Sequence, residues 1–147
     1  MLFYGKYEHS LDNKYRLRIP SRLREELFKD ELRPSKDNPF CIAKNDEGSL
    51  VIFPASTIKK IGEKIQDIGV PREKRKKLMV FLSSVYPIDE DAQGRFTLNA
   101  TLREYAGIKK DIVFVGDCDR ITLWDKTRWE AYEASCTEDI GLEEYGI

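Results

Sequence analysis

Apolar and polar residues alternate in two stretches of the chain, residues 14–19 and 95–99. Because successive side chains of a strand point to opposite faces, this period of two predicts two strands, each with one buried face. The apolar side of these strands carries Leu17, Ile19, Phe96 and Leu98. The polar side, which we expect to face solvent, carries Lys14, Arg16, Arg18, Arg95 and Thr97.

Other segments have the composition of short strands joined by turns. An aromatic-rich edge strand is expected over residues 2–8. Two hairpins follow, with strands predicted at residues 40–43, 50–53, 112–115 and 121–124. Turn-forming residues separate the strands of each hairpin: Asn45 to Gly48 in the first, and Asp117 and Asp119 in the second.

A short helix is predicted after each alternating stretch. The first covers residues 22–28, with Ser21 as its N-cap. Thr101 and Glu104 have the spacing of a capping box, which predicts that the second helix begins with Thr101 as its N-cap. Gly107 is expected to end this helix.

Longer helices are predicted after Pro54, Pro71 and Asp125. The first of them ends at Gly69 and carries an isoleucine stripe at helical spacing: Ile58, Ile61, Ile65 and Ile68. The second runs through a basic cluster, and the third carries Trp129, Tyr132 and Cys136.

The chain contains one unit twice. Residues 12–25 and 91–104 share an Asp, an Arg four positions later, two alternating apolar positions and a closing Leu-Arg-Glu. The match continues into the hairpins, where residues 50–54 resemble residues 121–125. A duplicated unit predicts a pseudo-symmetric fold that presents one surface element twice. It favours a binding module over an enzyme, because no catalytic set is duplicated.

This duplication leads to an expected organisation of the chain. It comprises a first repeat with its helix (residues 1–70), a basic connector helix (71–86), a second repeat with its helix (87–136) and an acidic tail (137–147). Both repeats are expected to fold as one intertwined α+β domain.

Composition limits the class of protein. The length of 147 residues and the 41% hydrophobic content suit one compact domain. No apolar run approaches the roughly 18 residues that cross a membrane, and no signal-peptide pattern is seen, which predicts a cytoplasmic protein. Cys41, Cys118 and Cys136 are widely spaced, so we expect buried free thiols rather than disulfides or a zinc site. No metal or cofactor is expected.

Charge is segregated along the chain, although the net charge is only −1. Residues 59–77 contain eight Lys or Arg against three acids, whereas residues 130–147 contain six acids and no Lys or Arg. An acidic end therefore masks a more basic body, which permits a basic face. Basic runs on helices are usually solvated faces, so the 59–77 cluster is by itself weak evidence of nucleic-acid binding.

The Asp-x-x-x-Arg motif predicts a local structure. Asp12 and Asp91 precede tight turns, where a carboxylate can accept backbone N–H groups, and Gly94 supplies the positive φ that such turns often need. The arginine four residues later emerges on the polar face of the strand. There it can pair with its own Asp, or bind a phosphate or a base edge. Lys14, Arg16 and Arg18 would form a cationic row on one strand.

These residues carry a resemblance to the MraZ family, which belongs to the AbrB-like swapped-hairpin group. The resemblance spans about residue 2 to Trp129 and includes the paired Asp-x-x-x-Arg motifs and three further segments: Met1-Leu2-Phe3-Tyr4-Gly5, Ile19-Pro20-Ser21-Arg22-Leu23-Arg24 and Leu123-Trp124-Asp125. It implies that two halves pair into one intertwined β-barrel core flanked by short helices.

The resemblance also implies a function. Members of the family are bacterial transcriptional regulators, encoded with the division and cell-wall genes that they control. They bind short direct repeats of double-stranded DNA upstream of their own gene, and their subunits assemble into rings. The implied locations are the cytoplasm and the nucleoid.

Site residues are carried over only to matching positions. Arg16 and Arg18 are expected as major DNA contacts, with Lys14 on a phosphate and Arg95 next in importance. The expected turn-shaping residues are Asp12, Tyr15, Asp91 and Gly94. Tyr15 stands where the family commonly has Gly, which predicts a slightly different first turn with Arg16 still exposed.

Two other classes of function remain open. A protein-interaction module on the same fold, antitoxin-like or a scaffold, would use the duplicated surface and exposed aromatics such as Tyr15. An enzyme is least favoured, because His9 is the only histidine and no glycine-rich phosphate loop is present. Steep salt dependence would favour DNA over an aromatic-anchored protein interface.

Overall fold

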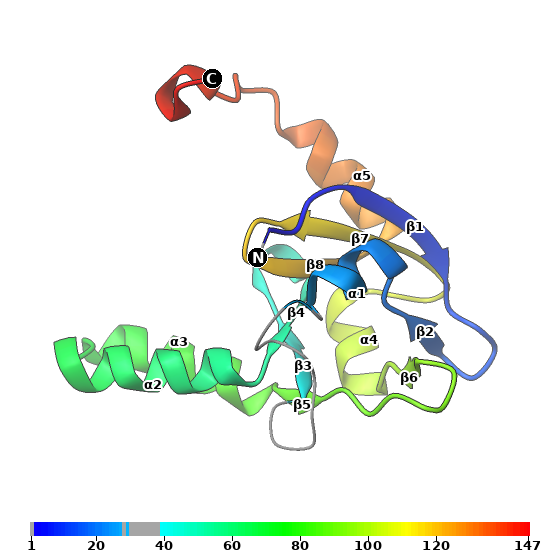
Figure 1. Ribbon diagram of the computed structural model, residues 1–147, viewed down its shortest axis with the longest axis horizontal. Coiled ribbons are helices and arrows are strands. Elements are labelled where there is room, and N and C mark those ends of the chain that lie inside the picture. Colours follow the sequence, from blue (N-terminus) through cyan, green and yellow to red (C-terminus); the bar gives the residue numbers. More distant parts are fainter. Residues whose placement is uncertain (1, 28, 30–38) are drawn as a thin grey trace.

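The computed structural model of the chain describes residues 2–27, 29 and 39–147, and these residues fold into an α+β structure (Figure 1). The strands are β1 (Lys6–Ser10), β2 (Arg16–Arg18), β3 (Phe40–Lys44), β4 (Leu50–Pro54), β5 (Tyr86–Pro87), β6 (Arg95–Thr97), β7 (Asp111–Asp117) and β8 (Arg120–Asp125). The helices are α1 (Ser21–Leu27), α2 (Ser56–Ile68), α3 (Arg72–Ser83), α4 (Ala100–Ala106) and α5 (Lys126–Ser135), with single 3-10 turns at Asp46–Gly48 and Leu142–Tyr145.

The strand pairing follows the duplication. Six antiparallel strands form one sheet in the order β1-β7-β8-β4-β3-β5, and β2 pairs with β6 in a separate two-stranded ribbon. In this order β1 of the first copy pairs with the hairpin of the second, and β5 of the second copy pairs with the hairpin of the first. Exchanging the two copies leaves the order unchanged, so the sheet has an internal pseudo-two-fold relation centred on the β4–β8 pair.

The sheet is open. Its edges are β1 and β5, and in the described residues these two strands do not pair with each other. The expected closed β-barrel is therefore not confirmed, whereas the antiparallel α+β architecture is.

Both copies contribute to one main core. Its fully buried members include Leu27, Leu50 and Ile52 from the first copy and Leu102, Phe114 and Leu123 from the second. Leu17 and Phe96, two of the four apolar positions in the alternating stretches, lie opposite each other in the ribbon and are 4% and 3% exposed. Burying such side chains contributes roughly 1.5–3 kcal/mol each. Because the two copies share these buried residues in one cluster, neither copy has a complete core alone.

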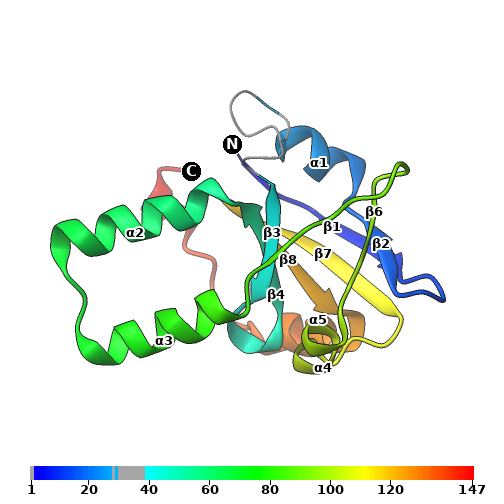
Figure 2. The same ribbon diagram turned by 90° about the horizontal axis from the view of Figure 1, so that it is seen from below.

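Helices α2 and α3 form an arm that projects from the sheet on the side opposite the β2–β6 ribbon (Figure 2). The arm is fixed at its base, where Phe81 packs on Phe53 of β4 with ring centroids 5.9 Å apart. Along the described part of the arm no side chain is fully buried, and the predicted stripe residues Ile58, Ile61 and Ile65 are only half-buried. The side chain of Ile68, the fourth predicted stripe residue, lies outside the described part of the structure. No helix in the described ranges is long and apolar enough to cross a membrane.

The helix ends differ from prediction in three places. Helix α5 ends at Ser135, so Cys136 follows the helix and is not part of it. The other two differences are at N-termini. Helix α4 begins at Ala100, so its N-cap is Asn99, whose Oδ1 accepts from Leu102 N at 2.9 Å. The Thr101 capping box is therefore wrong, because Thr101 lies inside the helix. Likewise Ser21 is the first residue of α1 and not its cap. The predicted helix ends at Gly69 and Gly107 and the predicted helix start after Asp125 are confirmed, and Asp125 is the N-cap of α5.

The expectation of buried thiols holds for one cysteine. Cys41 is buried in β3, and burial raises the pKa of its thiol. Cys118, in the β7–β8 turn, and Cys136, at the end of α5, are exposed, so for these two the expectation is wrong.

Candidate nucleic-acid interface

The first motif forms a tight turn closed by Asp12. Its Oδ1 accepts from the backbone N–H groups of Lys14 (2.9 Å) and Arg16 (2.8 Å), and its Oδ2 accepts from Arg16 Nε at 2.7 Å. Main-chain bonds between Asp12 N and Arg16 O (3.1 Å) and between Tyr15 N and Asp12 O (3.0 Å) complete the turn. One carboxylate thus orders both the backbone and the side chain that follows.

The second motif repeats this geometry atom by atom. Asp91 Oδ1 accepts from the N–H groups of Gln93 and Arg95, both at 2.9 Å, and its Oδ2 accepts from Arg95 Nε at 3.0 Å. Asp91 N donates to Arg95 O at 2.8 Å, and Gly94 N donates to Asp91 O at 3.0 Å. The two copies are therefore equivalent at the level of single hydrogen bonds.

Tyr15 adopts the conformation expected for glycine. Its φ is 59°, close to the 76° of Gly94, so the expected difference between the two turns is not found. A left-handed conformation costs a non-glycine residue about 1 kcal/mol. The guanidinium carbon of Arg103 lies 3.4 Å from the centroid of the Tyr15 ring, and this cation–π contact offsets the cost.

Each copy's short helix places an arginine against the turn of the other copy. Arg103 of α4 stacks on Tyr15, and its repeat equivalent Arg24 of α1 forms an ion pair with Glu90, next to the second turn. A Cβ on Gly94 would lie 3.2 Å from an Nη of Arg24. The two motifs are therefore held in place by each other's half of the chain.

The ribbon gathers the motif arginines on one face. In its antiparallel register Arg16 is opposite Thr97, and Arg18 is opposite Arg95. Residues that face each other, or that lie two apart on one strand, share a face, so these four side chains project together. The other face carries the buried pair Leu17 and Phe96. We name the face formed by Arg16, Arg18, Arg95 and Thr97 the ribbon face.

The charges of the ribbon face are only partly compensated. Arg16 and Arg95 are half-buried and paired with their own aspartates, whereas Arg18 is exposed and has no ion pair within the described residues. Like charges directly opposite each other destabilise a sheet, which applies to Arg18 and Arg95. A bound anion would relieve this repulsion.

The aspartates remain ionised throughout the neutral range. The backbone N–H of Arg16 holds the pKa of Asp12 below its usual value, helped by the Arg16 side chain and the N–H of Lys14. The backbone N–H of Arg95 does the same for the pKa of Asp91. Each guanidinium uses Nε for its aspartate, which leaves its Nη edge without a partner among the described residues. Such an edge suits bidentate binding to a phosphate or a guanine.

Lys14, the remaining predicted contact, lies in the first turn. It is exposed, outside β2, and has no ion pair in the part of the chain that the structure describes. It therefore lies beside the ribbon face and not on it.

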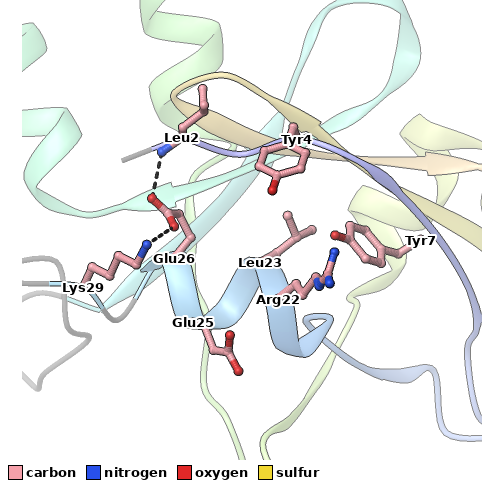
Figure 3. Close-up of a pocket in the computed structure, with 8 residues that line it drawn as sticks. All are labelled: Leu2, Tyr4, Tyr7, Arg22, Leu23, Glu25, Glu26 and Lys29. Carbon is pink, nitrogen blue, oxygen red and sulfur yellow. Dashed lines mark hydrogen bonds and ion pairs between the residues drawn. The ribbon is translucent and has the colours of Figure 1, made fainter.

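A cavity of about 200 Å³ lies elsewhere, between the N-terminal segment and α1 (Figure 3). Glu26 spans its wall: its Oε1 accepts from Leu2 N at 2.9 Å, and its Oε2 pairs with Lys29 at 2.8 Å. Arg22 and Glu25 also line it, so its two cations face two carboxylates. With no excess positive charge, this cavity is a poor phosphate site.

Sequence reasoning missed the roles of Arg24, Glu90 and Arg103. The shared Leu-Arg-Glu of the repeat was a signal, since it marks Arg24 and Arg103 as equivalents, but their partners lie in the other copy. In the described ranges no group of three or more His, Cys, Asp or Glu side chains is arranged to hold a metal ion.

Comparison with known proteins agrees with the motif evidence. A family model described as "MraZ protein, putative antitoxin-like" matches residues 2–79 and 81–143. A protein of Lactobacillus helveticus named "Transcriptional regulator MraZ" is 32% identical over 139 residues, covering 94% of this chain and 91% of its own. A protein of the same name from Clostridium beijerinckii is 33% identical, covering 91% of this chain and 89% of its own. Another, from Moorella thermoacetica, is 34% identical, covering 89% of this chain and 86% of its own. Matched along nearly its whole length, and carrying both copies of the motif in the same geometry, the chain belongs to the MraZ family.

Proposed function

We propose that this chain is a sequence-specific DNA-binding transcriptional regulator that acts in the cytoplasm, at the nucleoid. The target is a set of short direct repeats upstream of its own gene, in the cluster of division and cell-wall genes. The names of its relatives support regulation of transcription, and none of the three quoted is named as an enzyme. Both repeats act as one intertwined unit, with the swapped-hairpin barrel of the AbrB-like group as the proposed framework.

The ribbon face is the observation that carries the proposal. Arg16, Arg18 and Arg95 project from one side of a two-stranded ribbon, which has a size that the major groove of B-DNA admits. Arg16 and Arg95 are held at Nε by their aspartates, so less side-chain freedom is lost when the Nη edge binds. In this proposal Arg16 and Arg18 are the major contacts, Arg95 follows, and Lys14 binds a phosphate.

The four turn residues act indirectly. Asp12 and Asp91 fix the backbone and aim the arginines, while Tyr15 and Gly94 supply the left-handed position that the turn requires. Substituting either Asp is therefore expected to misdirect an arginine without removing any positive charge.

Affinity is proposed to come from many copies. One subunit offers only a few cations, so its binding is expected to be weak and steeply salt-dependent. A ring of subunits that engages spaced repeats together gains roughly two to four orders of magnitude in avidity. Head-to-tail subunits in a ring also present neighbouring motifs in the same sense, which suits direct rather than inverted repeats.

The test is a fluorescence-anisotropy titration with DNA from upstream of the gene and with a scrambled duplex, at several salt concentrations. We expect preference for the upstream DNA, a steep loss of affinity with salt, and a loss of about 1–3 kcal/mol in Arg16→Ala. Equal and feeble binding to both duplexes would reject the proposal. Unchanged affinity in an Arg16→Ala variant that assembles normally would reject the role of Arg16.

A protein-interaction module is the second candidate, since the family description contains the term antitoxin-like. Tyr15 is 43% exposed beside the ribbon face and would serve as an aromatic anchor for a protein partner. Binding to such a partner is expected to change little with salt, in contrast to DNA binding.

A further inference from the structure

Helix α3 carries an unpartnered mixed stripe on the side away from the sheet. Phe81 turns toward β4, and a set of exposed residues on α3 lies between roughly a quarter and half a turn away from it around the helix. These outward residues are Arg72, Arg75, Lys76, Met79 and Val80, which we name the α3 stripe. All five are exposed, with Met79 at 66% and Val80 at 62%. Apart from a loose Lys76–Glu73 pair (3.7 Å), their cations have no ion pair among the described residues.

The acidic tail, residues 137–147, has the complementary composition. It combines four acids (Glu138, Asp139, Glu143 and Glu144) with four apolar side chains (Ile140, Leu142, Tyr145 and Ile147). These apolar side chains are 48–81% exposed. Within the described residues the tail acids form no ion pair, and the hydrogen bonds of the tail, such as Ile147 N to Leu142 O (3.3 Å), stay inside it.

The tail keeps a defined shape without a partner. Gly141 and Gly146 bracket the 3-10 turn at Leu142–Tyr145 and take the left-handed φ values of 70° and 76°. The turn brings apolar and acidic side chains together in one short element. Solvated tails normally lack such a concentration of large apolar side chains, so this composition indicates a buried destination.

Within one chain the two surfaces are apart. Figure 1 shows the tail leaving α5 above the sheet, at the top of the view, whereas α3 lies in the arm at the lower left. We propose that the tail of one copy docks on the α3 stripe of a second copy, with Glu143 and Glu144 toward Arg75 and Lys76 and the apolar side chains over Met79 and Val80. Because donor and acceptor surfaces differ, the contact is head-to-tail, and repeated contacts of this kind close a ring or extend a filament.

This inference rests on the ring assembly proposed above and names the surfaces that would build it. It also gives the basic cluster a role other than DNA binding, which fits its place in the arm, opposite the ribbon face. Opposite charges set the pairing and its orientation, and the apolar side chains contribute affinity that persists in salt.

The experiment is a charge-swap exchange between two variants of the full chain, followed by sedimentation velocity over a range of concentrations. One variant is Glu143→Lys/Glu144→Lys, and the other is Arg75→Glu/Lys76→Glu. Lys59→Glu/Lys60→Glu on α2 is the matched control, since it makes the same charge change on exposed residues of the same arm. Thermal unfolding checks that each variant folds as the wild type does.

Each swapped variant alone is expected to self-associate at least about tenfold more weakly than the wild type, because two attractive pairs become repulsive. An equimolar mixture is expected to regain wild-type assembly, since each variant's tail then matches the other's α3 stripe. The control pair is expected to assemble like the wild type.

Three results would overturn the proposal: wild-type assembly by both swapped variants, a mixture that stays as weak as its components, or equal damage by the control pair. Restoration only when both swaps are made in one chain would place the contact within a subunit. The same variants are titrated with a duplex holding a single repeat, where normal binding is expected. Failed exchange with normal DNA binding would reject this inference alone, whereas absent DNA binding by the wild type would reject the proposed function.

Discussion

Replacing Gly116 with alanine is expected to destabilise the protein strongly. Gly116 lies in β7, where the N-terminal segment runs antiparallel beside the strand and Gly116 N donates to Gly5 O at 2.9 Å. A Cβ on Gly116 would lie 2.3 Å from Tyr4 N and 2.4 Å from Tyr4 Cα. Both are backbone atoms, so no side-chain rotation can relieve the contact, and either the segment or the strand must move.

The structure brackets the cost of that movement. If the segment shifts while staying bound, the cost is that of overpacking, about 1–3 kcal/mol. If it detaches, Phe3 loses a site where it is only 2% exposed, and a buried Phe is worth about 3–5 kcal/mol by truncation. The bonds between Phe3 N and Cys118 O (2.7 Å) and between Cys118 N and Phe3 O (3.0 Å) would be lost as well. We therefore expect a loss of about 1–5 kcal/mol in the free energy of unfolding.

Urea unfolding followed by circular dichroism measures this loss, and Gly62→Ala is the control. Gly62 lies in α2 and has nothing within 4 Å of an added Cβ, so the same substitution is expected to stabilise the helix by about 0.5–1 kcal/mol. Opposite signs at the two glycines are the expected result. A Gly116→Ala variant within about 0.5 kcal/mol of the wild type would refute the close packing of the Tyr4 backbone on Gly116.

Three further predictions follow from the helix caps, the motif turns and the thiols. Asn99→Ala is expected to lower the free energy of unfolding by about 1 kcal/mol, whereas Thr101→Ala leaves it nearly unchanged in the same urea titration; the reverse order would contradict the cap assignment. The lowered pKa values of Asp12 and Asp91 mean that their stabilising contribution is complete above the ordinary Asp value of about 3.9 and is lost as pH falls through their lower folded pKa values. Carboxyl carbon chemical shifts recorded by NMR against pH are expected to show both midpoints below that ordinary value, and midpoints at or above it would count against the turn geometry. A thiol-reactive dye is expected to label two cysteines rapidly and Cys41 only after denaturation, so that three rapid equivalents would contradict its burial.

Local features of this fold could be predicted from the sequence because they depend on neighbouring residues. The Asp-x-x-x-Arg pattern indicates its turn, since the carboxylate reaches N–H groups only two and four residues away. The alternating stretches gave the two strands of the ribbon and their buried faces. The repeat also predicted two equivalent halves, which the strand order reproduces.

Contacts between the two halves could not be predicted in the same way. Nothing near Tyr15 in the sequence explains its left-handed backbone, because the compensating ring contact comes from Arg103 on α4. The ion pair of Arg24 with Glu90 likewise joins residues 66 positions apart. Asn99 was missed for a smaller reason: helix α4 starts two residues before the capping-box pattern suggests, which makes Asn99 and not Thr101 the cap.

The most direct test of the central claim compares DNA discrimination in two charge-matched double variants. Arg16→Ala/Arg95→Ala removes one arginine of the ribbon face from each motif, and Lys59→Ala/Lys60→Ala removes two cations from the arm. Anisotropy titrations with upstream and scrambled duplexes give the affinity ratio for each variant. We expect the arginine variant to lose most of its preference for the upstream DNA and the lysine variant to keep it. Equal ratios in the two variants, or a loss only in the lysine variant, would contradict the assignment of the ribbon face as the DNA-reading surface.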